Sequence, residues 1–325
     1  MKYYFAPLEG ISLAPLRREH SREFPGIDKY FSPFLVANQT LHFHKSEIRD
    51  ILPENNQGLY LVPQILTNKA GQLLWALRTL AGYGYNEINL NLGCPMPQVA
   101  KRGRGAGFLA DPDELDRFFE TVFEGMAEQD MHLQLSVKTR IGISDIDEAV
   151  QLMRIYNRYP LSELIIHPRL MNEMYKGSPH MDIFEAMSAE SSHPVCYNGD
   201  LRTPADVSAF RNRYAGTDRV MIGRGLIADP SLVAKIKGIR TAPEAFVHYH
   251  DRLFEDYLAL YPDNRQAVSK MKDIWSFRPL CQPVNEKLFK KMRKAVTPDQ
   301  YLTYAHMLLS EAEGPVNSSF SCEAP

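Results

Sequence analysis

Residues 89–112 read NLNLGCPMPQVAKRGRGAGFLADP and connect two segments of different character. A β-rich apolar run at 86–92 comes before the glycine and proline residues, and an amphipathic run at 113–128 follows them. The segment therefore joins a strand to a helix. Repeated strand–helix alternation is typical of a parallel sheet, because parallel neighbours need a crossover connection.

The same alternation occupies most of the chain. The β-rich runs lie at 2–6, 33–37, 59–66, 86–92, 133–139, 163–167, 194–198 and 219–223. Amphipathic segments between them lie at 69–81, 113–128, 146–158 and 204–214. Eight strands in about 225 residues favour a (β/α)8 TIM barrel over an open doubly wound sheet. No glycine fingerprint of a dinucleotide fold follows the first run.

The β-rich runs stop near residue 240, and prolines then separate helical patterns. These patterns lie at 243–261, 264–277, 284–294 and 298–312. The sequence thus predicts an α/β protein with a TIM barrel over 1–240, a small all-helical C-terminal domain over 241–312, and a disordered tail over 313–325.

Composition sets limits on the function. The chain has 325 residues, of which 44% are hydrophobic and 23% charged, as in ordinary globular proteins. No apolar run is long enough to span a membrane, and the first residues lack the features of a signal peptide. Four cysteines without a CxxC pair disfavour a disulfide framework and a zinc site. We expect a cytoplasmic protein that uses no membrane and no metal.

Charge is segregated although the net charge is only −2. Segment 265–294 contains nine Lys or Arg residues against Asp273 and Glu286, which predicts a basic face for nucleic acid. Trp275 and Phe277 are candidates for base stacking in this segment; the alternative is a solvated helix face with aromatic residues in the core. The candidate RNA-phosphate contacts here are Lys290, Lys291 and Arg293.

Functional side chains of a parallel barrel lie at the carboxyl ends of its strands. Seven of the predicted strand ends carry polar or glycine-rich signals, more than a purely structural barrel needs. They are Pro7 to Gly10, Gln64, Asn91 with Cys94, Lys138 with Arg140, His167 with Arg169, Asn198 to Asp200, and Gly223 to Gly225.

The last two strand ends predict a phosphate site. Gly199 and Gly223 let the backbone approach a ligand closely, and Arg224 adds a charged donor. Loops after strands 7 and 8, followed by a short helix (here 229–238), form the recurrent phosphate site of TIM barrels. The alternative is two tight turns with a surface arginine.

Two basic strand-end residues suggest a ligand in the barrel mouth. Lys138 lies in an apolar strand, where an unpaired buried charge is costly unless it faces an anionic or electron-rich ring. The alternative is a lysine whose ammonium reaches solvent. His167 and Gln64 contact either a ligand or neighbouring protein groups.

Cys94 is the candidate reactive group. It follows a strand in a Gly-Cys-Pro turn, and an unperturbed thiol with a pKa of about 8.5 can donate a proton near neutral pH. The cationic loop residues Lys101, Arg102 and Arg104 would instead lower that pKa and make a nucleophile. The sequence leaves both open. Cys196 lies within a strand and is expected in the core.

These motifs together resemble the tRNA-dihydrouridine synthases of bacterial type, over nearly the whole chain. The matching segments are APLEG (6–10), the stretch at 89–112, KTR (138–140), HPRLMNEMYKG (167–177), YNGDLRTPAD (197–206) and VMIGRGLIADP (220–230). The resemblance implies a barrel that holds FMN, tRNA as substrate, and NADPH or NADH as a transient reductant. It also implies that a uridine is reduced to 5,6-dihydrouridine, with a hydride from the flavin and a proton from Cys94.

Residue by residue, the resemblance and the strand-end pattern give two sets of contacts. The expected cofactor contacts are Pro7, Leu8, Glu9, Gln64, Lys138, His167, Asn198, Gly199, Asp200, Gly223 and Arg224. The expected substrate contacts are Asn91, Lys101, Arg102, Arg104, Arg169, Lys290, Lys291 and Arg293. The glycines of KRGRGAG suggest a mobile cover. Two alternative functions are an FMN-dependent barrel reductase of a small pyrimidine and a non-enzymatic RNA-binding protein.

Overall fold

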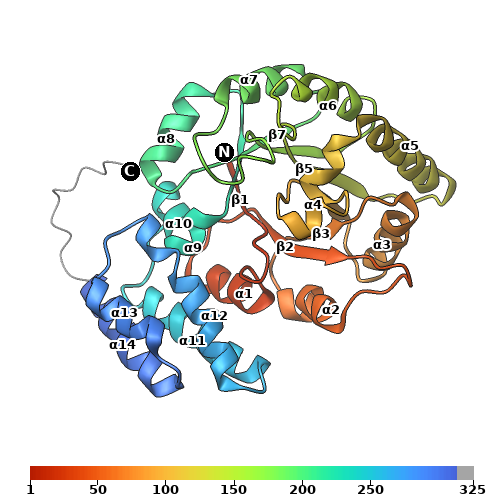
Figure 1. The fold of residues 1–325 in the computed structure, drawn as a ribbon. Helices are drawn as coiled ribbons and strands as arrows, with labels where there is room; N and C mark the ends of the chain where they lie inside the picture. Colours follow the sequence, from red (N-terminus) through yellow and green to blue (C-terminus); the bar gives the residue numbers. More distant parts are fainter. Residues whose placement is uncertain (313–325) are drawn as a thin grey trace.

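The computed structural model describes residues 1–312 and contains a closed barrel of eight parallel strands (Figure 1). The strands are β1 (Lys2–Phe5), β2 (Lys29–Val36), β3 (Leu61–Leu66), β4 (Glu87–Leu92), β5 (Gln134–Arg140), β6 (Glu163–His167), β7 (Val195–Asn198) and β8 (Arg219–Ile222). Sequential strands are neighbours, and β8 pairs with β1 to close the barrel. The predicted TIM barrel is confirmed. The tail predicted at 313–325 lies outside the described residues.

Helices surround the barrel and fill the loops at its carboxyl end (Figure 1). They are α1 (Ala14–Glu23), α2 (Lys45–Ile51), α3 (Ala70–Gly82), α4 (Pro97–Ala100), α5 (Pro112–Glu128), α6 (Glu148–Tyr156), α7 (Met181–Glu190), α8 (Pro204–Arg213), α9 (Arg224–Ala228) and α10 (Leu232–Lys237). Three 3₁₀ turns are η1 (Pro53–Asn56), η2 (Gly105–Ala110) and η3 (Arg278–Leu280).

Among the elements that differ from the sequence prediction, β2 and α1 do so for clear physical reasons. Strand β2 begins at Lys29 rather than at residue 33, because Lys29 and Tyr30 pair with β1. The register against β3 shifts between Phe31 and Phe34, around Pro33, which divides the strand. Helix α1 was not predicted, because the polar residues Arg17 and His20 are among those it buries. An inward-facing polar side chain hides the apolar stripe by which a helix is recognised.

The barrel interior is closed by an apolar layer with a charged layer beneath it. The apolar cluster comprises Tyr4, Ala6, Phe31, Val62, Ile165, Cys196 and Met221. The expected core position of Cys196 is confirmed, since it is 0% exposed. Near the amino ends of the strands, the buried Glu163 accepts hydrogen bonds from Tyr4 Oη (2.8 Å) and Arg219 Nη1 (3.0 Å). These contacts fasten three strands together below the cavity.

Four helices follow the barrel and pack beside α1 and α9 (Figure 1). They are α11 (Ala245–Leu260), α12 (Asn264–Trp275), α13 (Glu286–Lys294) and α14 (Pro298–Ala312). The ring of Phe24 lies 5.0 Å from that of Phe246, and Arg252 pairs with Glu23 at 2.7 Å. The helical content is as predicted, whereas the domain boundary at residue 240 stays a prediction. Among residues 1–312, no helix is long and apolar enough to cross a membrane.

Candidate active site

A cavity of ≈ 620 Å³ opens at the carboxyl ends of the barrel strands. The predicted site residues that line it are Pro7, Leu8, Glu9, Gln64, Asn91, Cys94, Lys138, His167, Asn198, Gly199, Asp200, Gly223 and Arg224. Side chains from seven strand ends therefore meet in one space. The other predicted contacts, namely Arg169 and those on the cationic loop and on α13, lie outside this wall.

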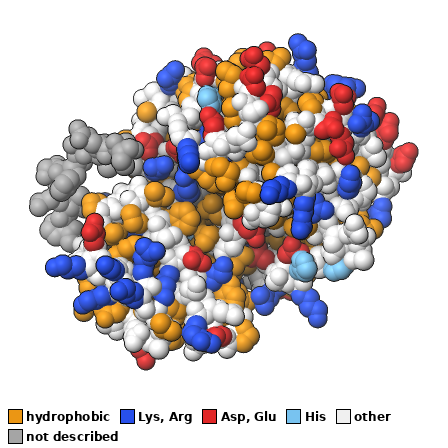
Figure 2. Space-filling model, viewed as in Figure 1, with side chains coloured by type: hydrophobic (Ala, Val, Ile, Leu, Met, Phe, Trp, Pro, Cys, Tyr) orange, Lys and Arg blue, Asp and Glu red, His pale blue; other side chains and the backbone are white. Residues whose placement is uncertain are grey.

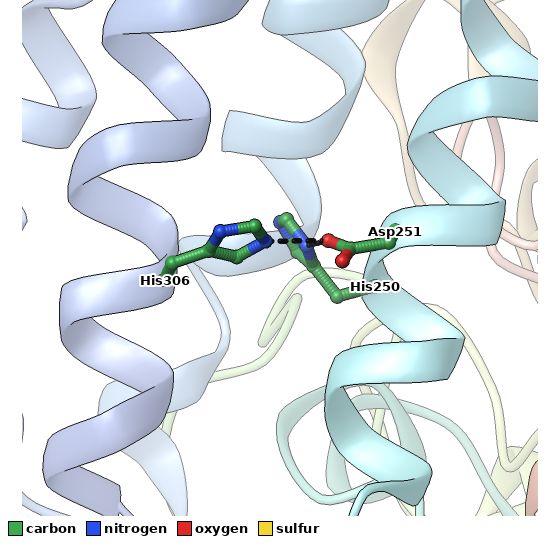
Figure 3. A group of neighbouring side chains, drawn as sticks. All are labelled: His250, Asp251 and His306. Atoms are coloured by element: carbon green, nitrogen blue, oxygen red, sulfur yellow. Dashed lines mark hydrogen bonds and ion pairs between the residues drawn. The ribbon is translucent and has the colours of Figure 1, made fainter.

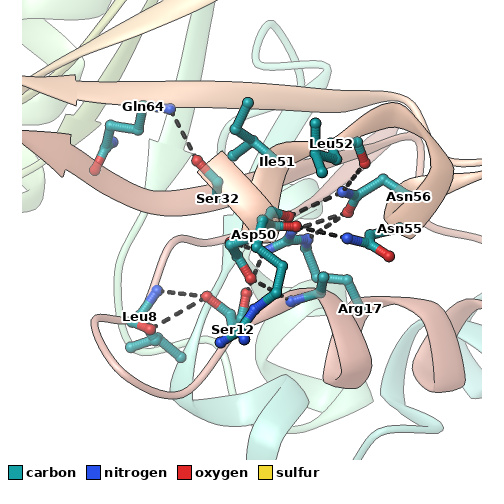
Figure 4. A network of polar contacts seen from close by, with 12 residues as sticks. Leu8, Ser12, Arg17, Ser32, Asp50, Ile51, Leu52, Asn55, Asn56 and Gln64 are labelled. Atoms are coloured by element: carbon teal, nitrogen blue, oxygen red, sulfur yellow. Dashed lines mark hydrogen bonds and ion pairs between the residues drawn. The ribbon is translucent and has the colours of Figure 1, made fainter. Parts of the chain in front are cut away.

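A buried arginine fixes the first loop of the cavity wall (Figure 4). Leu8 N–H donates to Ser12 Oγ at 2.8 Å. Arg17 Nη1 donates to the Ser12 carbonyl at 2.6 Å and to Asp50 Oδ2 at 3.0 Å, while its Nη2 donates to Asn56 Oδ1 at 2.8 Å. Arg17 is 0% exposed, so every donor needs such a partner. It therefore acts as a positioning residue for the loop that carries Pro7 to Glu9.

Glu9 lies where the helical region meets the cavity rim. Partial burial and the nearby carboxylates of Glu47 and Asp50 raise the pKa of Glu9 to about 7, while Lys270 acts in the opposite direction. Lys270, on α12, donates from Nζ to the Gly10 carbonyl at 3.0 Å. The C-terminal helices thus touch the loop that lines the cavity.

A chain of side-chain amides connects the barrel interior to the cysteine turn. Asn91 Nδ2 donates to Gln64 Oε1 at 2.7 Å, and Gln64 Nε2 donates to Asn89 Oδ1 at 2.7 Å. Asn91 Oδ1 accepts the backbone N–H groups of Gly93 (3.0 Å) and Cys94 (2.9 Å). Asn91 thereby places the cysteine and keeps one amide N–H for a ligand.

Cys94 is held as a thiol rather than as a thiolate. Burial raises its pKa, and the opposing charges of Lys138 and Arg140 do not reverse that direction. The cationic loop does not lower its pKa, contrary to one of the two possibilities left open by the sequence. A protonated thiol in a cavity is suited to donate a proton.

The loop after Cys94 makes close backbone contacts at two of its glycines. Ala106 N–H donates to the Cys94 carbonyl at 3.0 Å. A Cβ atom at Gly105 would lie 2.7 Å from the Cys94 carbonyl oxygen, and one at Gly107 would lie 2.4 Å from the Ala100 carbonyl oxygen. These two glycines serve close backbone approach, while the mobile cover inferred from KRGRGAG stays a prediction. The cations in this loop are Lys101, Arg102 and Arg104.

Lys138 and His167 give the cavity an unusual electrostatic character. Burial lowers the pKa of Lys138 to about 8, with Arg140 acting in the same direction, and no acidic side chain within residues 1–312 pairs with its ammonium. Burial and the same cations lower the pKa of His167 well below its usual value, so the ring is neutral. Because Arg169 Nη1, a donor only, lies 3.1 Å from His167 Nε2, the ring proton is on Nδ1.

Arg169 does not line the cavity, so the predicted contact between Arg169 and the substrate is wrong. The side chain is 0% exposed and donates to the carbonyls of Lys176 (3.2 Å) and Gly177 (2.6 Å) and to Asp200 Oδ2 (2.5 Å). Arg224 Nη2 donates to the other oxygen of Asp200 at 2.5 Å. Burial alone would raise the pKa of Asp200, but these arginines hold it below its usual range. Arg169 therefore positions His167 and Asp200.

The sequence reasoning missed Tyr175, an exposed aromatic on the cavity wall. Arg140 and Arg224 place their guanidinium carbons 5.5 and 5.0 Å from its ring centroid. Met174 has a positive φ of 56°, and its carbonyl accepts from Arg140 Nη2 at 2.7 Å. A left-handed, non-glycine residue is kept only where contacts hold it. The signal was an aromatic residue in HPRLMNEMYKG, at a position outside every predicted strand and helix.

The predicted phosphate loops approach each other as expected, with one correction. A Cβ at Gly225 would lie 2.4 Å from the Leu201 carbonyl oxygen, so only glycine allows this contact between the β7 and β8 loops. The helix that begins at the cavity is α9, directly after Gly223, and not the predicted helix at 229–238, which corresponds to α10. Arg202 also lines the cavity, and its buried Nε has no hydrogen-bond partner among the described residues.

The basic segment forms a surface on α13. The side chains of Lys290, Lys291 and Arg293 are exposed, and Figure 2 shows blue side chains gathered where Figure 1 places this helix. Trp275, a candidate for base stacking, is instead 5% exposed and donates from Nε1 to Tyr301 Oη at 2.8 Å. It belongs to the core, whereas Phe277 lines the cavity.

Known proteins resemble this chain in sequence and in fold. The family model described as Dihydrouridine synthase (Dus) matches residues 4–298. The tRNA-dihydrouridine(16) synthase of Cupriavidus necator is 29% identical over 73% of this chain and 74% of its own length. A probable tRNA-dihydrouridine synthase of Staphylococcus aureus is 29% identical over 99% of this chain and 96% of its own. Morphinone reductase shares the fold with a TM-score of 0.54 at 12% identity, covering 75% of this chain and 88% of its own.

Proposed function

The chain belongs to the dihydrouridine synthase family, and from that premise we propose that it reduces a uridine of tRNA to 5,6-dihydrouridine with FMN as cofactor. The observation that carries this proposal is the meeting of a protonated Cys94 thiol, a free N–H of Asn91 and an unpaired Lys138 ammonium in one cavity. Mapping dihydrouridine in tRNA from a strain that lacks the gene tests it. If dihydrouridine is lost at one tRNA position in that strain, the proposal is supported. If every dihydrouridine remains, the proposal is contradicted.

The residues present fit FMN. The Lys138 ammonium has no acidic partner among residues 1–312, and an electron-rich flavin ring would compensate it. The unpartnered Nε of Arg202, the Arg224 guanidinium and the glycines of the β7 and β8 loops offer donors and space for a phosphate. Pro7 to Glu9 and Gln64 would line the ring, while Asn198 and Asp200 lie beside the phosphate donors. When bound, FMN would supply the hydride.

The protein's part in the reaction is to position the base and to donate a proton. The free N–H of Asn91 would donate to a carbonyl oxygen of the uracil, while its Oδ1 keeps the Cys94 turn in place. The Cys94 thiol would then protonate carbon 5 of the base. The raised pKa of Cys94 keeps that proton available near neutral pH. A uridine within a folded tRNA must leave its stack to enter such a cavity.

Arg224→Ala is expected to weaken FMN binding by about 10-fold or more, because a hydrogen bond to a charged group contributes about 1.5–3 kcal/mol. Flavin content after gel filtration and fluorescence titration with FMN measure the effect. Arg213→Ala, an exposed arginine on α8, is the matched control and should keep its flavin. Equal FMN affinity in both variants would remove Arg224 from the phosphate site.

The basic surface on α13 is proposed to bind tRNA phosphates. Replacing Lys290, Lys291 and Arg293 by glutamine should weaken tRNA binding and lower the salt dependence of log K by up to about 2–3, since each phosphate contact contributes about 0.7–0.9. The matched control replaces three exposed arginines on the barrel helices, namely Arg117, Arg154 and Arg211. If both triple variants lose the same affinity, the α13 surface has no special role.

Family membership makes the chain an oxidoreductase, and we propose NADPH or NADH as the reductant that recharges the flavin. The tRNA substrate points to a cytoplasmic location. Because the Cupriavidus necator relative is named for position 16, that position is the first to examine in the tRNA map. A reductase of free pyrimidines would need neither the α13 surface nor the contact of α12 with the cavity rim.

A further inference from the structure

Three side chains that commonly bind metals meet between α11 and α14, away from the cavity (Figure 3). His250, Asp251 and His306 each offer one ligand atom, and these atoms lie within 4.8 Å of one another. Asp251 Oδ1 is 2.7 Å from His250 Nδ1 and 2.7 Å from His306 Nε2. Asp251 and His306, which this carboxylate oxygen joins, are 55 positions apart in the chain.

We propose that His250, Asp251 and His306 bind one divalent transition-metal ion, with Zn²⁺ as the best match, and that the ion fastens α14 to α11. Two imidazole nitrogens and one carboxylate oxygen are a donor set suited to Zn²⁺. Mg²⁺ and Ca²⁺ favour sites built from oxygen alone. Three protein ligands leave the fourth tetrahedral position to water. The composition had suggested no metal because cysteine pairs are missing, but this set contains no cysteine.

The surroundings of His250 resemble those of a metal ligand. Its other ring nitrogen, Nε2, lies 2.7 Å from Tyr301 Oη, which also accepts from Trp275 Nε1 at 2.8 Å. Histidines that bind metals almost always engage the second nitrogen in this way, which fixes the ring and its tautomer. Without an ion, Nδ1 carries the proton and donates to Asp251 Oδ1. In the other tautomer, with the proton on Nε2 and donated to Tyr301 Oη, the lone pair of Nδ1 would face the metal.

Only a small movement is needed to admit the ion. Tetrahedral coordination with bonds of about 2.0 Å separates the ligand atoms by about 3.3 Å, so each nitrogen–oxygen contact must open by about 0.6 Å. The side chains of Asp251 and His306 are 36% and 46% exposed, so both can adjust and water can reach the fourth position. His250 is 5% exposed and stays in place.

Equilibrium dialysis of the FMN-loaded full chain against Zn²⁺, followed by elemental analysis, tests the proposal. We expect one ion per chain, and at least a 10-fold loss of affinity in His306→Ala and in Asp251→Asn. His248→Ala removes an exposed histidine from the same helix and should bind as the wild type does. Zn²⁺ should also raise the Tm of the wild type and of His248→Ala, but not of the two ligand variants.

Two results would overturn the proposal. The first is no stoichiometric binding by the wild type, or equal Zn²⁺ affinity in the wild type and His306→Ala. The second is binding that survives in His306→Ala but disappears in Cys94→Ala or Cys281→Ala, which would assign the ion to a thiol. Because His306 is exposed, its replacement leaves the fold intact, and an unchanged FMN content checks this for each variant.

Discussion

Cys94→Ala should reduce the rate of uridine reduction by about 10²- to 10⁴-fold, the usual contribution of a general acid. The substitution removes the thiol that lies on the cavity wall in its protonated form. Flavin content and tRNA affinity should stay at the wild-type level, because the backbone of the turn is held by Asn91 and not by the thiol. Single-turnover formation of dihydrouridine measures the effect separately from flavin reduction.

Cys281→Ala is the control for the loss of a thiol as such. Cys281 is partly exposed, lies outside the cavity wall, and its thiol donates to the Arg202 carbonyl at 3.4 Å. We expect this variant to react as the wild type does. Wild-type rates in Cys94→Ala would show that another group, or water, protonates the base.

Arg17→Met should lower the free energy of unfolding by about 3–5 kcal/mol, as expected when one partner of a buried ion pair is removed. The substitution leaves Asp50 without its main cation and leaves the Ser12 carbonyl and Asn56 Oδ1 without their donors (Figure 4). Because the same contacts hold the loop of Pro7 to Glu9, FMN should also dissociate more readily. Denaturant titration and flavin content measure the two effects.

Arg22→Met provides the matched comparison on the same helix. Arg22 is 50% exposed, and its one ion pair within residues 1–312 is with Glu19. Glu19 keeps Arg18 as a second partner, so the loss should stay near the about 0–1 kcal/mol of solvent-accessible ion pairs. A loss of stability in Arg17→Met no larger than that in Arg22→Met would contradict the role given to the buried network.

Local sequence patterns were sufficient to predict the barrel and most of the residues that line the cavity. Strands buried on both faces appear as short apolar runs, and the polar residues that end them, such as Gln64, Asn91 and Lys138, are brought together by barrel closure. The expectation that functional side chains lie at the carboxyl ends of the strands therefore predicted most residues of the cavity wall from the sequence alone. The same expectation wrongly predicted that Arg169 contacts the substrate, because Asp200, which pairs with the buried guanidinium, lies 31 residues further along the chain.

Contacts between residues far apart in the chain could not be predicted from the sequence. Arg17 finds Asp50 and Asn56 only in the folded chain, and no periodic pattern connects them. Tyr175 reaches the cavity because Arg140 holds the carbonyl of Met174 in a left-handed turn. The same limit applies to His250 and His306, which meet only when α14 packs on α11. Such contacts are set by tertiary packing and not by local propensity.

The most direct test of the account mixes chemically reduced, FMN-loaded protein anaerobically with unmodified tRNA and follows flavin absorbance together with dihydrouridine. We predict that the flavin is oxidised in a single turnover, that one dihydrouridine forms per flavin, and that free uracil or orotate leaves the flavin reduced. A flavin that stays reduced with tRNA but is oxidised by a free pyrimidine would contradict the proposed function.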